Sequence, residues 1–113
     1  YFLSCNSKNY FSFPEHEKDS FNVVWINVIK LVDTDIHIND LMLKLSHKGI
    51  DSRNLFYPAH KQLFLTSGPS SESFPVSEDL YLKGMYVPSG SNLTKKDILY
   101  ISETIEKTFL ELR

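Results

Sequence analysis

Residues 49–62 have the sequence GIDSRNLFYPAHKQ, which passes from the end of a helix through a short strand into a loop. Gly49 supplies the left-handed conformation that commonly ends a helix. Residues 51–56 are expected to form the strand. It stops at Pro58, which has no backbone N–H to donate. Three polar side chains in a row follow the proline: His60, Lys61 and Gln62. We therefore expect a loop that Pro58 makes rigid at its start and that carries hydrogen-bond donors.

The preceding part of the chain predicts two strands and a helix. Residues 11–13 alternate in polarity as a short strand does, and a proline follows them. Residues 21–31 are rich in β-branched and aromatic side chains on both faces, which predicts a mid-sheet strand covered on both sides. Apolar residues at helical spacing predict a helix over residues 38–48. Either Asp35 or Asn39 could cap its start.

The following part predicts a loop, two helices and a strand. Residues 57–73 contain two prolines, a glycine and four serines, so they should form a long loop. A short helix is expected over residues 76–82 and a short strand over residues 85–87. Thr94 is expected to cap the last helix, with Asp97 completing a variant of the capping box. The buried stripe of that helix should consist of Ile98, Ile101, Ile105, Phe109 and Leu112. Together these elements predict an α+β fold, a small and mainly antiparallel sheet covered by helices.

Composition excludes several classes of protein. The 113 residues include 42% hydrophobic and 23% charged residues, as in soluble globular domains. The net charge is -2 and no Lys/Arg cluster occurs, so we expect neither nucleic acid nor a membrane as a partner. Cys5 is the single cysteine, which excludes an internal disulfide. The longest mainly apolar run, residues 23–29, is too short to span a bilayer. We expect residues 1–20 to be an N-terminal connecting segment of a cytoplasmic protein.

Arg53 and His60 are the first candidates for chemistry. Arg53 lies two residues from Asp51 on one strand face, so the two side chains could simply form a surface ion pair. Alternatively, the guanidinium could bind a phosphate or carboxylate. A lone loop histidine such as His60 is usually solvated or locally hydrogen-bonded. We expect Phe56 and Trp25 to lie in the core. The other histidines have no metal-ligand spacing and are expected at the surface: His16, His37 and His47.

Four stretches in this order resemble one known family. They are residues 49–62, then SFPVSE at 73–78, YVPSG at 86–90 and LTKKDI at 93–98. Over residues 9–113 the chain resembles the C-terminal part of the DegT/DnrJ/EryC1/StrS sugar aminotransferases, and within them the perosamine synthase type. These enzymes use pyridoxal phosphate.

The resemblance implies that residues 21–113 are the small C-terminal domain of a fold-type I aminotransferase. The full-length enzyme would use pyridoxal phosphate to transfer an amino group, from glutamate, to a nucleotide-linked keto-deoxy sugar in surface polysaccharide biosynthesis. It would act as a homodimer, and this domain would contact its own N-terminal domain. The resemblance also implies a set of substrate-binding residues on the loop and the strand before it: Arg53, Tyr57, His60, Lys61 and Gln62.

The groups that carry pyridoxal chemistry are missing from this sequence. A pyridoxal enzyme needs a lysine in a desolvated pocket, a carboxylate for the ring nitrogen and donors for the phosphate. In the family these lie in the large N-terminal domain, and no matching segment or glycine-rich phosphate loop occurs here. We therefore expect this chain to be inactive alone and to bind no cofactor covalently. Two alternatives remain open, a stand-alone binding or interaction module of the same fold and an unrelated α+β interaction domain.

If the chain is part of a longer enzyme, an exposed apolar patch should mark the point where the N-terminal domain attaches. The sequence places the expected contributors near its start: Tyr1, Phe2, Leu3, Tyr10 and Phe11.

Overall fold

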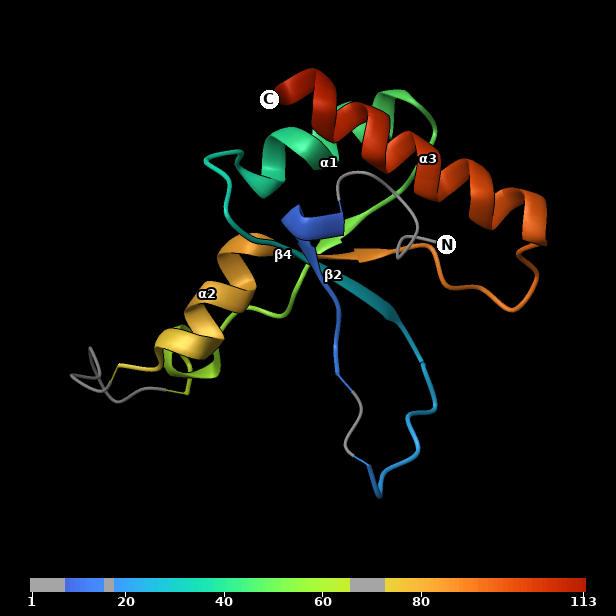
Figure 1. Ribbon diagram of the computed structural model, residues 1–113. Coiled ribbons are helices and arrows are strands. Elements are labelled where there is room, and N and C mark those ends of the chain that lie inside the picture. The colour runs from blue at the N-terminus through green and yellow to red at the C-terminus, as the bar shows by residue number, and fades with distance from the viewer. Residues whose placement is uncertain (1–7, 16–17, 66–72) are drawn as a thin grey trace.

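The computed structural model describes residues 8–15, 18–65 and 73–113, which form one antiparallel sheet and three α-helices (Figure 1). The strands are β1 (Phe11–Ser12), β2 (Asn27–Leu31), β3 (Arg53–Asn54) and β4 (Gly84–Val87). The α-helices are α1 (Ile38–His47), α2 (Pro75–Lys83) and α3 (Lys95–Leu112), and two short 3-10 helices are η2 (Lys8–Tyr10) and η3 (Ala59–Lys61). The order in the sheet is β1-β2-β4-β3, with every neighbouring pair antiparallel. The predicted α+β fold is therefore confirmed.

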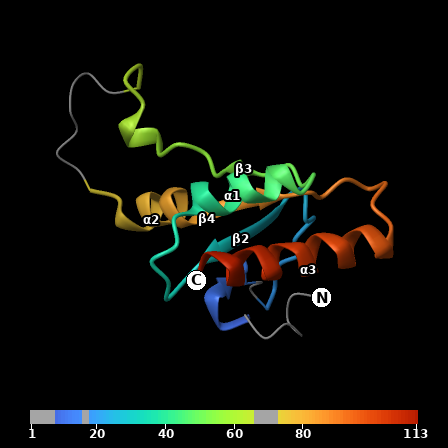
Figure 2. The same cartoon turned by 90° about the horizontal axis from the view of Figure 1, so that it is seen from above.

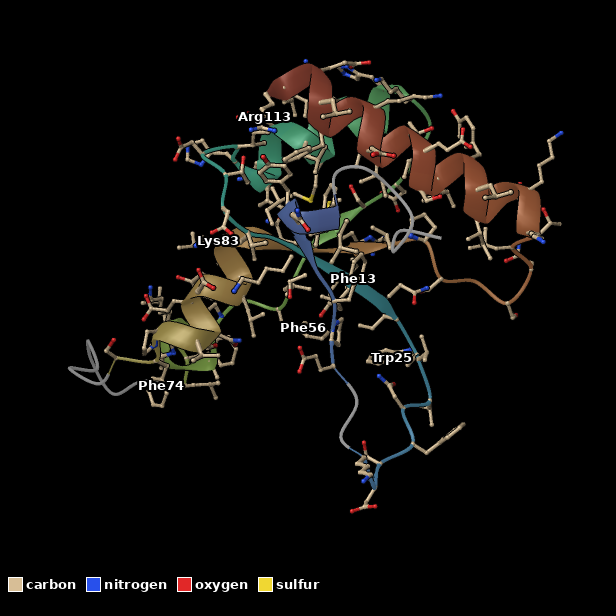
Figure 3. The ribbon with its side chains drawn as sticks, viewed as in Figure 1. Phe13, Trp25, Phe56, Phe74, Lys83 and Arg113 are labelled. Atoms are coloured by element: carbon tan, nitrogen blue, oxygen red, sulfur yellow. The ribbon has the colours of Figure 1, made fainter. Side chains whose placement is uncertain are left out.

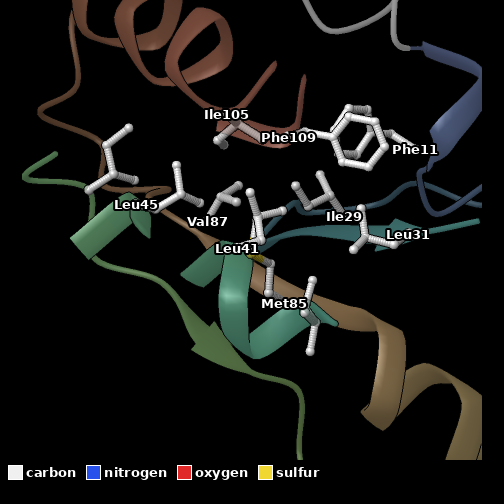
Figure 4. Packing of buried hydrophobic residues seen from close by; sticks show 11 residues of the cluster. Phe11, Ile29, Leu31, Leu41, Leu45, Met85, Val87, Ile105 and Phe109 are labelled. Atoms are coloured by element: carbon white, nitrogen blue, oxygen red, sulfur yellow. The ribbon is translucent and has the colours of Figure 1, made fainter. Parts of the chain in front are cut away.

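The core lies between one face of the sheet and the helices α1 and α3. Those two helices pack against each other, and Figure 2 shows them from above over the strands. Side chains from β1, β2 and β4 meet them in the cluster drawn in Figure 4. The cluster consists of Phe11, Ile29, Leu31, Ile38, Leu41, Leu45, Ile50, Met85, Val87, Ile105 and Phe109. The third helix, α2, lies away from α1 and α3 and contacts β4 and β2 (Figure 1).

The predicted strand over residues 21–31 is wrong in its first half. β2 lies mid-sheet as expected but begins at Asn27, opposite Val87, the last residue of β4. The next residue of that neighbour is Pro88, which cannot donate to the ladder, so the pairing stops there. Residues 21–25 are exposed, and the segment leads away from the sheet in Figure 1. Trp25, expected in the core, is 73% exposed.

The predicted cover on both faces of this strand is met only in part, because the second face has only α2 beside it, through the pair of Lys30 with Asp79. Ile29 and Leu31 point into the core and are buried, whereas Val28 and Lys30 on the other face are only half-buried. The apolar side chains before the strand belong to the projecting segment and have no helix above them: Phe21, Val23, Val24 and Trp25 are all exposed. Val24 also adopts a positive φ of 45°, which is uncommon for a β-branched residue.

The expected helices are all present, with differences at their ends. Helix α1 begins after His37 without a side-chain cap, so neither Asp35 nor Asn39 caps it. Gly49 follows α1 with φ +78°, the left-handed conformation expected there. Thr94 caps α3 and forms the predicted capping box with Asp97.

The predicted buried stripe of α3 is correct at its centre and wrong at its start. Ile105 and Phe109 are fully buried, and Ile101 and Leu112 pack against the core. Ile98 is 40% exposed, because it lies in the first turn of α3, which projects beyond the other elements in Figure 1.

The predicted apolar patch near the N-terminus is wrong for the residues that can be described. Phe11 is 5% exposed, because its pairing with Leu31 places its ring against Phe109, with ring centroids 5.1 Å apart. Tyr10 packs on the same ring at 5.3 Å. The other three expected members, residues 1–3, lie outside the described residues. Exposed apolar side chains occur instead in several other stretches, among them residues 21–25, 63–65 and 74–82.

Candidate functional site

The segment from Tyr57 to Gln62 folds into a tight turn at the start of the long loop. Pro58 is buried and starts the 3-10 helix η3, with the Lys61 amide donating to the Pro58 carbonyl at 3.0 Å. The Gln62 amide then donates to Ala59 at 3.1 Å. The Gln62 side-chain amide closes the segment by donating to the Tyr57 carbonyl at 3.2 Å. The residues that the sequence singled out thus share one turn, except for Arg53.

Glu78 of α2 binds two side chains of this turn at once. His60 Nε2 lies 3.0 Å from Glu78 Oε1, and Lys61 Nζ donates to Glu78 Oε2 at 2.5 Å. The His60 side chain is 12% exposed and the Lys61 side chain 42% exposed. The histidine therefore faces the helix, and the lysine reaches the surface beside it.

Two aromatic contacts flank the carboxylate. The ring of His60 lies 4.7 Å from that of Phe74, at the start of α2, which Figure 3 labels. The ring of Tyr57 meets Tyr81 edge to face at 5.1 Å. Phe74, Glu78 and Tyr81 are spaced by four and three residues, so they share one face of α2. The turn packs against that face of α2.

Electrostatics support the same arrangement. Lys61, and after it His60, hold the pKa of Glu78 below its ordinary value by hydrogen bonds to the charged carboxylate. The neighbouring Asp79 points to other partners, because Lys30 of β2 and Lys83 both pair with it. These contacts, led by the one from Lys30, lower the pKa of Asp79. Glu78 thus fixes the turn to α2, and Asp79 fixes α2 to the sheet.

Arg53 is not part of this cluster. It lies on β3 opposite Tyr86 and forms an ion pair with Asp51 at 3.6 Å. Both side chains are about four-fifths exposed, at 79% and 81%. The surface ion pair that the sequence suggested is therefore present. Phe56, predicted in the core, is 72% exposed and lies edge-on to Tyr86 at 5.6 Å, because β3 ends before it and no helix covers that position.

Glu78, Phe74 and Tyr81 are the members of the site that the sequence did not single out. Their helical spacing in FPVSEDLY is visible in the sequence, and it marks them as one face. The sequence does not show what that face meets, since the contact crosses the long loop.

In the part of the chain that the structure describes, neither a metal-binding cluster nor a buried lysine adds to the site. Within the described ranges, no group of three His, Cys, Asp or Glu side chains could hold a metal ion. His37 and His47 are exposed as expected, and His16 lies outside the described residues. Every lysine whose side chain the structure describes is half-buried or exposed. In the same ranges, no helix is both long and apolar enough to cross a membrane.

The fold and the turn define the class of protein. It is a small α+β domain in which a turn with an exposed lysine packs through aromatic contacts against α2. Comparison with known proteins gives its family. The model of the DegT/DnrJ/EryC1/StrS aminotransferase family matches residues 3–106, and the chain belongs to that family. The resemblance noted from the sequence is therefore confirmed.

Two relatives are GDP-perosamine synthases. The one from Escherichia coli O157:H7 is 30% identical over 95 residues, covering 84% of this chain, and the one from Vibrio cholerae is 29% identical over 91 residues, covering 80%. A solved structure, Helicobacter pylori PseC, an aminotransferase involved in the biosynthesis of pseudoaminic acid, has a similar fold, with a TM-score of 0.67 at 18% identity over 76% of this chain. The chain spans 25% of each perosamine synthase and 24% of PseC.

Proposed function

We propose that this chain is the C-terminal small domain of a nucleotide-sugar aminotransferase. In this proposal residues 21–113 form the domain and residues 1–20 connect it to the N-terminal domain. The whole enzyme transfers an amino group from glutamate to a keto-deoxy sugar nucleotide in polysaccharide biosynthesis, in the cytoplasm and as a homodimer. The family match over residues 3–106 and the two relatives named as perosamine synthases support this proposal.

The domain's part in that reaction is to bind substrate, and Lys61 carries this role. Its ammonium group has three donors, of which Glu78 takes one. The remaining donors lie on a partly exposed side chain at the surface of the turn. A phosphate-linked sugar presents anionic oxygens, and charge-assisted hydrogen bonds to such oxygens are the strong ones.

Other residues of the turn surround this cation. Tyr57 is 46% exposed, so part of it is available for contact with a sugar or base, and its contact with the ring of Tyr81 restrains its orientation. Gln62 closes the turn through its side-chain amide, and we include it among the substrate contacts. His60 contributes mainly by anchoring the turn, since its ring is largely covered. Arg53 is retained as a second, separate anion contact.

Pyridoxal phosphate does not fit the lysines whose side chains the structure describes. The cofactor forms its bond to a lysine whose surroundings lower its pKa by desolvation, and a half-buried or exposed lysine lacks those surroundings. We therefore assign the cofactor lysine to the N-terminal domain of the longer enzyme.

The test uses the full-length enzyme and the variant Lys61→Met. Loss of one charge-assisted contact costs about 1.5–3 kcal/mol of binding, so KM for the sugar nucleotide should rise roughly ten- to a hundredfold. Lys107→Met is the matched control, because Lys107 is 72% exposed and pairs only weakly with Glu103 along α3. Equal kinetics for the two variants would remove Lys61 from the substrate site. A wild-type enzyme that transfers no amino group to any keto sugar nucleotide would overturn the function itself.

A further inference from the structure

The turn at residues 57–62 depends on α2 for its position. Among the described residues, its backbone hydrogen bonds join the turn to its own neighbours in the loop. Its side chains reach the α2 segment at three points: Tyr57 meets Tyr81, His60 meets Phe74 and Glu78, and Lys61 meets Glu78. Of these contacts, only those at Glu78 involve charge, and only Glu78 touches two residues of the turn.

The two oxygens of Glu78 serve two residues with different exposure. One oxygen holds the covered ring of His60, and the other holds the ammonium of Lys61 at the surface. Lysine has a flexible four-carbon stem, so an unrestrained side chain would lose more conformational freedom when it binds an anion. A carboxylate that already holds the ammonium group removes part of that loss before substrate arrives.

We propose that Glu78 is a positioning residue for substrate binding, which sets the place of the Lys61 ammonium through its shared contact with His60. This inference rests on the proposed function of the turn. Glu78 touches no substrate itself in this arrangement; it acts through Lys61. A negative charge beside Lys61 also weakens the attraction for an anion, and this effect has the opposite sign. If positioning dominates, removal of the carboxylate should weaken binding of the sugar nucleotide. If charge neutralisation dominates, the same removal should leave that binding unchanged or strengthen it.

The experiment compares three variants of the full-length enzyme: Glu78→Gln, Glu78→Asp and Asp79→Asn. Glu78→Gln keeps the side-chain length and loses the charge, so KM for the sugar nucleotide should rise about tenfold with kcat changed less than about twofold. Glu78→Asp keeps the charge on a shorter side chain and should restore part of the loss. Asp79→Asn removes the adjacent carboxylate, which pairs with Lys30 and Lys83 and not with the turn, so it should lower the melting temperature without changing KM.

A second measurement, on the 113-residue chain, does not need enzymatic activity. Backbone ¹⁵N relaxation should show larger fast motions of residues 59–62 in Glu78→Gln than in wild type or Asp79→Asn. If the enzyme is active and KM is unchanged or lower in Glu78→Gln, the positioning role is overturned and charge neutralisation dominates. If relaxation changes as expected but the wild type does not use sugar nucleotides, the proposed function fails while the hold of Glu78 on the turn stands. Unchanged relaxation in Glu78→Gln would overturn that hold.

Discussion

Lys48 and Glu111 join the end of α1 to the end of α3, although 63 residues separate them in the sequence. The Lys48 ammonium donates to both carboxylate oxygens, at 2.9 Å and 2.7 Å. The hydroxyl of Tyr100, also on α3, donates to the Lys48 backbone carbonyl at 3.1 Å. The same residue therefore ties the two helices together through its side chain and its backbone, over the core.

Glu111→Gln should lower the melting temperature of the chain. The substitution removes one charge of a pair that links two helices, and the loss should shrink as salt is added because the pair is solvent-accessible. Thermal unfolding at low and high salt measures both effects. Glu103→Gln is the matched control, since its pair with Lys107 lies within one helix at 3.7 Å. An equal change in the two variants would show that the link between helices contributes nothing beyond an ordinary surface pair.

The free energy of unfolding should fall in mild acid. Among the described residues, four carboxyl groups have a pKa held below the ordinary value, each mainly by its hydrogen-bonded partner: Glu78, Asp79, Asp97 and Glu111. A carboxyl with a lower pKa in the folded state stabilises the fold above its ordinary value, 4.5 for Glu and 3.8 for Asp, and this contribution is lost as pH falls through the folded pKa.

Urea unfolding between neutral pH and about pH 3 measures this dependence, which should begin near the ordinary value for Glu. A double variant, Glu78→Gln with Glu111→Gln, should be less stable at neutral pH and should lose less stability on acidification. The same acid slope in the double variant and the wild type would assign the effect to other groups.

Phe109→Ala should be the most destabilising of the simple truncations. The ring is fully buried and contacts the rings of Tyr10 and Phe11, so its removal leaves a cavity. Phe→Ala changes of this kind cost about 3–5 kcal/mol. Leu110→Ala on the exposed side of the same helix is the control and should change stability by well under half of that. Denaturant unfolding measures both variants; similar losses would mean that the core is not centred on this ring.

Gly84→Ala should destabilise the chain, because an added methyl group would crowd Leu55 and the junction of α2 and β4. A methyl group at Gly84 would lie 2.4 Å from a terminal methyl of Leu55 and 2.6 Å from the Leu80 carbonyl oxygen. The leucine side chain can move, but the backbone oxygen belongs to the last turn of α2. Gly90→Ala is the control, because its methyl would approach only the flexible side chain of Asn92. Denaturant midpoints should fall more for Gly84→Ala, and equal midpoints would contradict the close packing at the junction of α2 and β4.

The sequence predicted most elements because their signals are local. Helix α3 follows from its capping box and apolar spacing. A short strand that leads into a loop at Pro58 follows from a helix stop, a strand pattern and a proline within fourteen positions, although β3 covers only Arg53–Asn54 of the expected residues 51–56 and the turn η3 was not predicted. Trp25 and Phe56 were misplaced because an apolar strand pattern shows which residues alternate but not where pairing ends. Pro88, on a different strand, ends it for β2. Glu78 was missed for a similar reason, since its partners lie 17 and 18 residues away along the chain.

The exposed position of Trp25 has a spectroscopic consequence. It is the one tryptophan of the chain, and it lies on the projecting segment rather than in the core. Its emission in the folded chain should already resemble that of a solvated indole, so melting of the core will hardly change it. A shift of that emission to shorter wavelength will instead report any event that covers the segment, such as contact with another domain or another copy of the chain. Fluorescence therefore measures association in this protein, and the near-ultraviolet signal of tyrosines such as Tyr10 measures folding.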